Sequence, residues 1–215
     1  MADPFSDPFA DLGVRVELVS TDKYFRDVSI GLYATESDGI WCYRIRSFAK
    51  YDGIADRITY LLDAMVKLGG MVPGSVEDSV QFVCGGEHLV AVRRLFLQAC
   101  KEKPDATPTA RTLSMWDKKS ELTINAVNAG QGVYDLALEN GENDRRLGAL
   151  RNAMVKLADA KADETAGERF CFTCGQDHDA MVGLLLQAAP NVRAVMREFE
   201  MNAARGVLLA PGSQE

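Results

Sequence analysis

The chain has 215 residues, 47% of them hydrophobic, and a formal net charge of −7. This length and apolar content allow a substantial buried core. The acidic balance, without any run of basic residues, argues against nonspecific nucleic-acid binding, which needs clustered Lys and Arg.

Three features of the sequence bear on the compartment in which the protein is expected. The first residues lack the basic region and the apolar segment of a secretory signal. The most apolar segments, 89–100 and 180–189, are too short to cross a bilayer. Five cysteines without disulfide-framework spacing fit a reducing environment. We therefore expect a cytoplasmic protein that has neither nucleic acid nor a membrane as its partner.

The predicted elements occur twice in the same order. Alternating apolar residues predict strands, and apolar residues at helical spacing predict helices. Each time, a short strand ends in a cysteine and precedes a closing helix that is apolar on most sides. The predicted segments are 14–19, 28–32, 40–48, 54–68, 80–84 and 89–100 in the first copy, and 111–116, 122–126, 133–138, 147–157, 170–174 and 180–189 in the second.

Two sequence matches indicate that this order reflects an internal duplication. Ala64–Leu68 is identical to Ala153–Leu157, displaced by 89 positions. The only two histidines, His88 and His178, end the related pentapeptides Cys-Gly-Gly-Glu-His and Cys-Gly-Gln-Asp-His, displaced by 90. A slip of one residue would turn every side chain of a strand to the other face, so the alternation before each cysteine favours a displacement of 90 there.

The sequence therefore predicts an α+β fold made by tandem duplication of a (β)ββαβα unit. We expect mostly antiparallel strands, in one sheet or two, with helices packed on one face and the copies related by a pseudo-twofold axis. The predicted organisation is a flexible tail, a first unit, a linker, a second unit and a second tail, forming one compact body. Their ranges are 1–13, 14–103, 104–108, 109–207 and 208–215.

The paired pentapeptides supply the candidate ligand-binding residues. Each would place a thiol at the end of a strand, then a glycine turn, then an acid and an imidazole where a helix begins. Backbone N–H groups at such a helix start can bind an anion and can activate a thiol. A purely structural role, with buried thiols and acids that complement the helix dipole, explains the same pattern. The candidates are Cys84, Gly85, Glu87, His88, Cys174, Gly175, Asp177 and His178.

A metal site is weighed separately. Cys171 and Cys174 have the spacing of a zinc knuckle, but residues three apart on a strand point to opposite faces and cannot share one tetrahedral ion. A composite site of two cysteines and two histidines would require the two copies to bring their loops together. The sequence prediction is accordingly no bound metal, no cofactor and no assigned catalytic residue.

We expect a non-catalytic protein-interaction module: a scaffold, adaptor, chaperone or accessory subunit that binds a protein partner. The alternative is a small-molecule or anion-binding protein, or an enzyme, that uses the paired Cys-Gly-x-acid-His turns. Formation of a homo-oligomer is left open.

Overall fold

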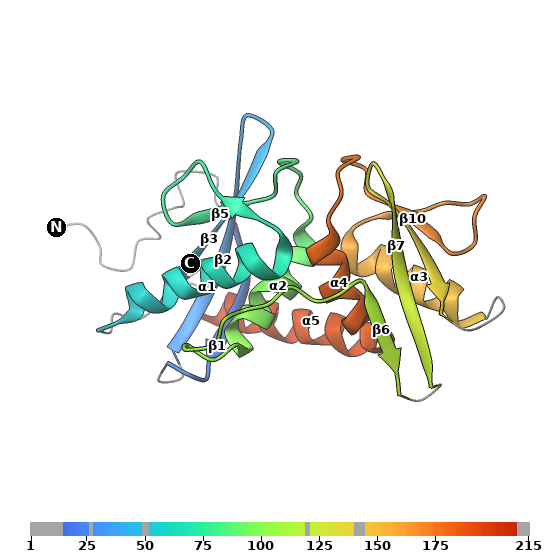
Figure 1. The fold of residues 1–215 in the computed structure, drawn as a ribbon. Helices are drawn as coiled ribbons and strands as arrows, with labels where there is room; N and C mark the ends of the chain where they lie inside the picture. Colours follow the sequence, from blue (N-terminus) through green and yellow to red (C-terminus); the bar gives the residue numbers. More distant parts are fainter. Residues whose placement is uncertain (1–14, 26–27, 49–51, 119–120, 140–144, 210–215) are drawn as a thin grey trace.

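The computed structural model describes residues 15–25, 28–48, 52–118, 121–139 and 145–209 (Figure 1). The predicted tail at 1–13 lies outside these residues, and so does most of the predicted tail at 208–215. The predicted boundary at 207 falls inside the last helix, which continues to Leu209.

Two five-stranded antiparallel sheets, one in each half of the chain, form the framework (Figure 1). The first has the order β1-β2-β3-β5-β4 and the second β6-β7-β8-β10-β9, so each strand has its counterpart at the same place. The α+β prediction is confirmed, and the repeated order is consistent with duplication. The strands are β1 Arg15–Asp22, β2 Val28–Ser37, β3 Ile40–Ser47, β4 Val72–Pro73, β5 Ser79–Gln81, β6 Ser114–Asp117, β7 Leu122–Gly130, β8 Val133–Leu138, β9 Lys161–Ala162 and β10 Arg169–Cys171.

One face of each sheet carries the apolar residues that the alternation predicted. Ile30 and Leu32 of β2 are fully buried, as are Tyr43 and Ile45 of β3. A two-residue turn joins these strands, with Asp38 at φ 54° and Gly39 at φ 78°. Two successive positive φ angles match the right-handed twist of a tight hairpin. We did not predict β4 and β9, because two residues are too few to show alternation.

The helices pack between the sheets. They are α1 Ile54–Gly69, α2 Leu89–Lys101, α3 Arg145–Ala158, α4 Asp179–Ala188 and α5 Val192–Leu209, with a 3₁₀ turn, η2 Ala189–Asn191, before α5. Between the units, α1 contacts α4, α2 contacts α3, and α2 contacts α4. Exchanging the units leaves this set of contacts unchanged, as the predicted pseudo-twofold arrangement requires. Within the first unit, a Cβ at Gly69 would lie 2.6 Å from Leu95 Cδ1, so this glycine permits close packing of α1 on α2.

Close packing occurs inside the second unit as well as between the units. Within the second unit, the segment before β6 passes so close to α4 that a Cβ at Gly183 would overlap the carbonyl oxygen of Arg111. Helix α5 has no counterpart among the described residues of the first unit, and it joins the two units by packing against β1. Its Val195 and Phe199 are buried, and its Glu198 accepts a hydrogen bond from Lys101 Nζ at 2.9 Å. We predicted no helix beyond residue 189.

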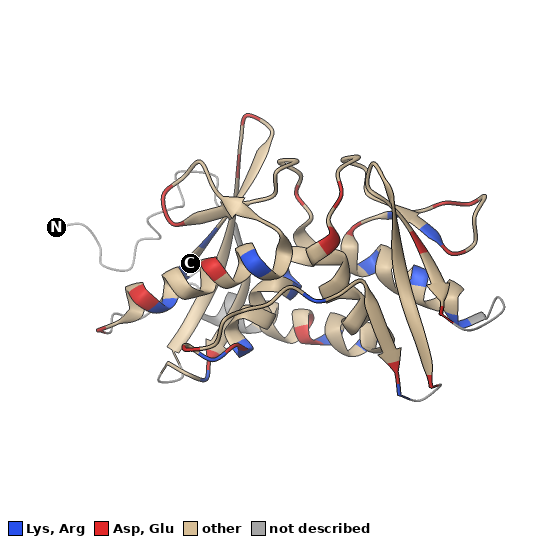
Figure 2. Cartoon of the chain, in the orientation of Figure 1, with Lys and Arg blue, Asp and Glu red and all other residues tan. Residues whose placement is uncertain are grey.

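Charged residues of both signs occur on both units. Figure 2 shows acidic and basic positions interspersed along them. Among the residues that the structure describes, no helix combines the length and the apolar character that a membrane crossing requires.

Candidate metal centre

The two Cys-Gly-x-acid-His segments form similar turns. Gly85 N donates to Phe82 O at 2.9 Å, and Gly175 N donates to Phe172 O at 3.1 Å. Both glycines adopt left-handed backbone, with φ of 70° and 68°. This conformation is easily available to glycine, which has no Cβ. Each hydrogen bond therefore closes a turn that contains the cysteine, and the chain then leads into α2 or α4.

The helix packing brings these two loops side by side between the sheets (Figure 1). Cys84 Sγ lies 3.2 Å from His88 Nε2, and Cys174 Sγ lies 3.2 Å from His178 Nε2. Across the units, Cys84 Sγ lies 3.8 Å from His178 Nε2. The four side-chain ligand atoms all lie within 4.8 Å of one another. A composite site required the two loops to lie close together, and in the structure they do.

These separations suit a tetrahedral zinc ion. With Zn–S bonds of about 2.3 Å and Zn–N bonds of about 2.0 Å, neighbouring ligand atoms are separated by roughly 3.3 to 3.8 Å. Three of the four sulfur–nitrogen distances, at 3.2, 3.2 and 3.8 Å, are close to that range. The widest separation in the group, up to 4.8 Å, would have to shorten on binding an ion. Two thiolates and two imidazoles form a ligand set typical of structural zinc.

Aromatic side chains shield the two histidines of this group from water, whereas the two cysteines are half-buried. Phe82 meets the rings of His88 and His178 edge-on, with centroids 5.1 and 5.3 Å apart. Phe172 meets the same two rings at 5.6 and 4.7 Å. Each phenylalanine therefore contacts the histidine of its own unit and that of the other. The two histidines are only 5% and 7% exposed.

Hydrogen bonds hold the second loop in position. His178 N donates to Tyr134 Oη at 2.7 Å, and that hydroxyl donates to Asp179 Oδ1 at 2.8 Å. Asp177 Oδ1 accepts from Gly132 N at 2.7 Å, which attaches the loop to the β7–β8 turn. The predicted candidate Asp177 thus anchors the loop and is not one of the four grouped ligands. Sequence reasoning did not select Tyr134, because the tyrosine lies on a strand 44 positions from the histidine that it supports.

The first loop is held differently. Gly86 N donates to Cys84 Sγ at 3.3 Å. A Cβ at Gly86 would lie 2.9 Å from His88 Nε2, so a side chain here would crowd the imidazole. His88 itself has φ of 39°, a left-handed conformation that is uncommon outside glycine and that costs energy. The predicted candidate Glu87 is half-buried on this loop and is not one of the grouped ligands. Figure 2 shows acidic positions on both loops.

The other cysteines of the described residues lie outside the cluster. Cys171 ends β10 and does not join the group. The predicted strand 170–174 therefore ends three residues early, and Cys174 lies in the turn that follows it. Cys42 and Cys100 are buried elsewhere. Cys171 is nevertheless half-buried near the same loop, which makes it a matched control for substitutions at Cys174.

Burial favours the neutral forms of Cys84, His88 and His178 in the absence of metal. It raises the pKa of the Cys84 thiol to about 11, and the neighbouring Cys174 acts in the same direction. Burial also lowers the pKa of His178 to about 4, with a further contribution from His88, whose own pKa is lowered by burial. A cysteine nucleophile needs the opposite, a thiolate beside an imidazolium. The metal-free Cys84–His88 pair is therefore poorly suited to nucleophilic catalysis.

We predict that metal-free protein loses stability as the pH falls below 6.5. Unfolded histidine takes up a proton near that pH, whereas folded His178 does so only near 4. Protonation therefore favours the unfolded state in the interval between them, at a cost of about 2 kcal/mol by pH 5. Urea denaturation in the presence of a chelator at pH 6.5 and 5.0 measures the loss. The His88→Asn/His178→Asn double variant, which has no histidine, should lose most of this dependence; an unchanged dependence would contradict the assignment.

Comparison of the chain with family models, with curated proteins and with solved structures found no match. The geometry of the cluster is therefore the basis of the functional proposal.

Proposed function

We propose that the protein is a non-catalytic interaction scaffold whose two α+β units are fastened together by one zinc ion. The ligands are Cys84 and His88 from the first unit and Cys174 and His178 from the second. The observation that carries the proposal is the convergence of these four ligand atoms to within 4.8 Å from two distant loops.

The ligand set supports a structural role. Catalytic zinc keeps a coordination position for water or substrate, whereas four protein ligands complete the tetrahedron. Thiolate and imidazole together favour zinc over magnesium and calcium, which prefer oxygen ligands. Because each unit supplies one cysteine and one histidine, the ion would crosslink the units at their contact. The alternative function, an anion site at the two helix starts, would use the same loops without a metal.

Zinc content should depend on the four ligands and not on the neighbouring thiol. We expect one zinc per chain after purification under reducing conditions with zinc present, measured by elemental analysis. Cys84→Ser and Cys174→Ser should each lose most of the ion in competition with a colorimetric chelator, because a neutral hydroxyl replaces a thiolate. Cys171→Ser is the control and should retain it.

Absence of stoichiometric zinc from the unsubstituted protein would refute the proposed metal centre. Equal loss from Cys171→Ser and Cys174→Ser would refute the assigned ligands. Binding of inorganic phosphate by metal-free protein, abolished in the His88→Asn/His178→Asn variant, would support the anion-site alternative instead.

A further inference from the structure

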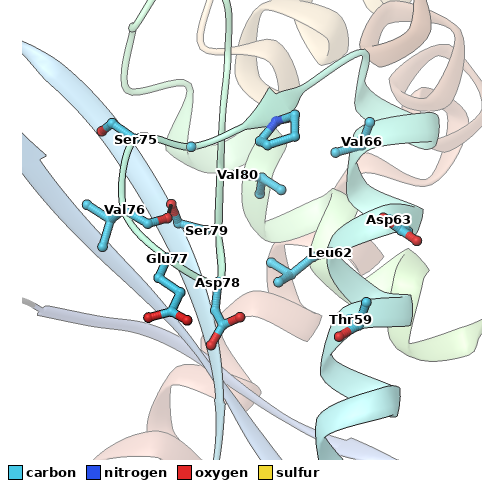
Figure 3. A pocket seen from close by; sticks show the side chains of 12 residues that line it. Thr59, Leu62, Asp63, Val66, Ser75, Val76, Glu77, Asp78, Ser79 and Val80 are labelled. Atoms are coloured by element: carbon cyan, nitrogen blue, oxygen red, sulfur yellow. Dashed lines mark hydrogen bonds between the residues drawn. The ribbon is translucent and has the colours of Figure 1, made fainter.

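A pocket of about 460 Å³ lies in the first unit between α1 and the β4–β5 hairpin (Figure 3). We call it the hairpin pocket. Leu62, Val66 and Val80 form its apolar lining. Of its acidic residues, Asp63 lies on α1, whereas Glu77 and Asp78 lie on the hairpin opposite (Figure 3). None of the described residues that line it is basic. Arg46 reaches Asp78 at 3.7 Å, in a pair that is largely exposed and so contributes little.

The second unit contains the equivalent hairpin. Gly74 N donates to Ser79 O at 2.8 Å, and Asp163 N donates to Arg169 O at 3.0 Å, so the two hairpins close in the same way. The identical pentapeptides in α1 and α3 set the helix correspondence, with a displacement of 89. Leu62 of α1 therefore occupies the position that Arg151 occupies in α3.

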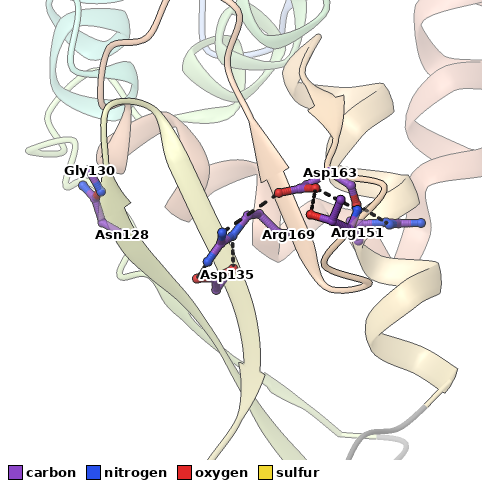
Figure 4. A network of polar contacts seen from close by, with 7 residues as sticks. Asn128, Gly130, Asp135, Arg151, Asp163 and Arg169 are labelled. Carbon is purple, nitrogen blue, oxygen red and sulfur yellow. Dashed lines mark hydrogen bonds and ion pairs between the residues drawn. The ribbon is translucent and has the colours of Figure 1, made fainter.

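In the second unit, the position equivalent to Leu62 is occupied by an arginine that contacts the hairpin. Arg151 Nη1 donates to the carbonyl oxygen of Asp163 at 3.5 Å (Figure 4). The Asp163 carboxylate lies 4.0 Å from Arg169 Nη1, and Arg169 Nε in turn lies 2.7 Å from Asp135 Oδ1. Each hairpin thus has an arginine of the chain near one of its carboxylates, Arg169 near Asp163 and Arg46 near Asp78. Only the second hairpin also has a guanidinium from its helix, that of Arg151. In the first unit, leucine replaces Arg151 and leaves the space beside the hairpin open, with acidic residues at its edge.

We propose that the hairpin pocket binds an arginine side chain of a protein partner. The methylene groups of an arginine can lie along Leu62 and Val66, as such stems commonly lie on apolar surface. Its guanidinium can then reach the carboxylates of Asp63 and Glu77 and the hairpin carbonyls, in the manner of Arg151. This inference rests on the proposed interaction role and does not depend on the zinc site.

The test uses a short peptide on the zinc-loaded protein. Titration with acetyl-Gly-Gly-Arg-Gly-Gly-amide, followed by amide chemical shifts, should move the signals of Gly74, Ser75 and Glu77 with a dissociation constant of about 1 mM. The peptide with citrulline in place of arginine has nearly the same shape without the charge, and it should bind at least about tenfold more weakly. The equivalent lysine peptide reports whether the planar guanidinium is needed, and we expect weaker binding.

Two variants locate the site. Leu62→Arg places in the first unit the side chain that the second unit already has, and it should abolish peptide binding. Asp63→Asn/Glu77→Gln, which changes exposed side chains only, should weaken binding by about three- to tenfold. No hairpin shifts up to about 10 mM peptide, equal binding of the citrulline peptide, or unchanged binding by the second variant would each overturn the proposal. Zinc content measured on the same samples separates failure of the pocket from failure of the metal centre.

Discussion

Zinc-loaded protein is expected to melt about 8 to 16 °C above metal-free protein. A ligand at a thousandfold excess over its dissociation constant stabilises the folded state by about 4 kcal/mol, and each kcal/mol shifts the melting temperature of a chain of this size by about 2 to 4 °C. The ion would bind mainly the folded protein, because the two ligand pairs come from loops 90 positions apart. Differential scanning calorimetry with and without zinc measures the shift.

Ligand substitutions should remove this shift in a specific way. His88→Asn and Cys174→Ser should melt close to metal-free protein whether or not zinc is added. Cys171→Ser should keep the full increase, because its sulfur lies outside the cluster. A zinc-dependent increase that survives in Cys174→Ser would mean that the ion binds elsewhere. If zinc-loaded and metal-free unsubstituted protein had the same melting temperature, zinc would not stabilise the contact between the units.

Breaking the buried ion pair between Asp22 and Arg57 should destabilise the protein by about 3 to 5 kcal/mol. Arg57 Nε lies 2.6 Å from Asp22 Oδ2, with side-chain exposures of 2% and 0%. Asp22 Oδ1 also accepts from Tyr24 N, and Arg57 Nη2 donates to Glu102 O at 3.1 Å. The pair thus connects the end of β1, the first turn of α1 and the end of α2. Arg57→Met would leave the carboxylate buried without its cation, and urea denaturation would measure the cost.

The second unit offers a control for this prediction. Asp135 and Arg169 form two hydrogen bonds, at 2.7 and 2.9 Å, but both side chains are more than a third exposed. Asp135→Asn should therefore cost less than about 1 kcal/mol. If Arg57→Met cost no more than Asp135→Asn, burial would not determine the contribution of the first pair. Replacing both Asp22 and Arg57 with apolar residues should cost less than Arg57→Met alone.

Local pattern was sufficient to predict most elements of each unit. Alternation places Ile30 and Leu32 on the buried face, and the structure confirms it. The helix starts are consistent with the displacement of 90, because Val92 N bonds to His88 O and Val182 N bonds to His178 O. Helix α5 has Val192, Val195 and Phe199 at helical spacing, yet it lacks a counterpart in the first unit. Reasoning from the duplication therefore passed over it.

The candidate site could be predicted only in part. The paired motifs named all four clustered residues, because chemistry-bearing side chains recurred at one place in each copy. Whether the two loops meet depends on packing of α1 against α4 and of α2 against α3, which no local pattern contains. The difference between Leu62 and Arg151 is likewise visible in the aligned sequence. Only the three-dimensional structure shows what this difference causes: an open space beside the first hairpin and a guanidinium beside the second.

X-ray absorption at the zinc edge tests the central claim most directly. For protein loaded with one equivalent of zinc, we predict two sulfur atoms at about 2.3 Å and two imidazole nitrogens at about 2.0 Å. In Cys174→Ser one sulfur should disappear from this shell, and in Cys171→Ser the shell should stay unchanged. A shell of oxygen ligands, or three or more sulfur atoms around the ion, would contradict the proposed centre.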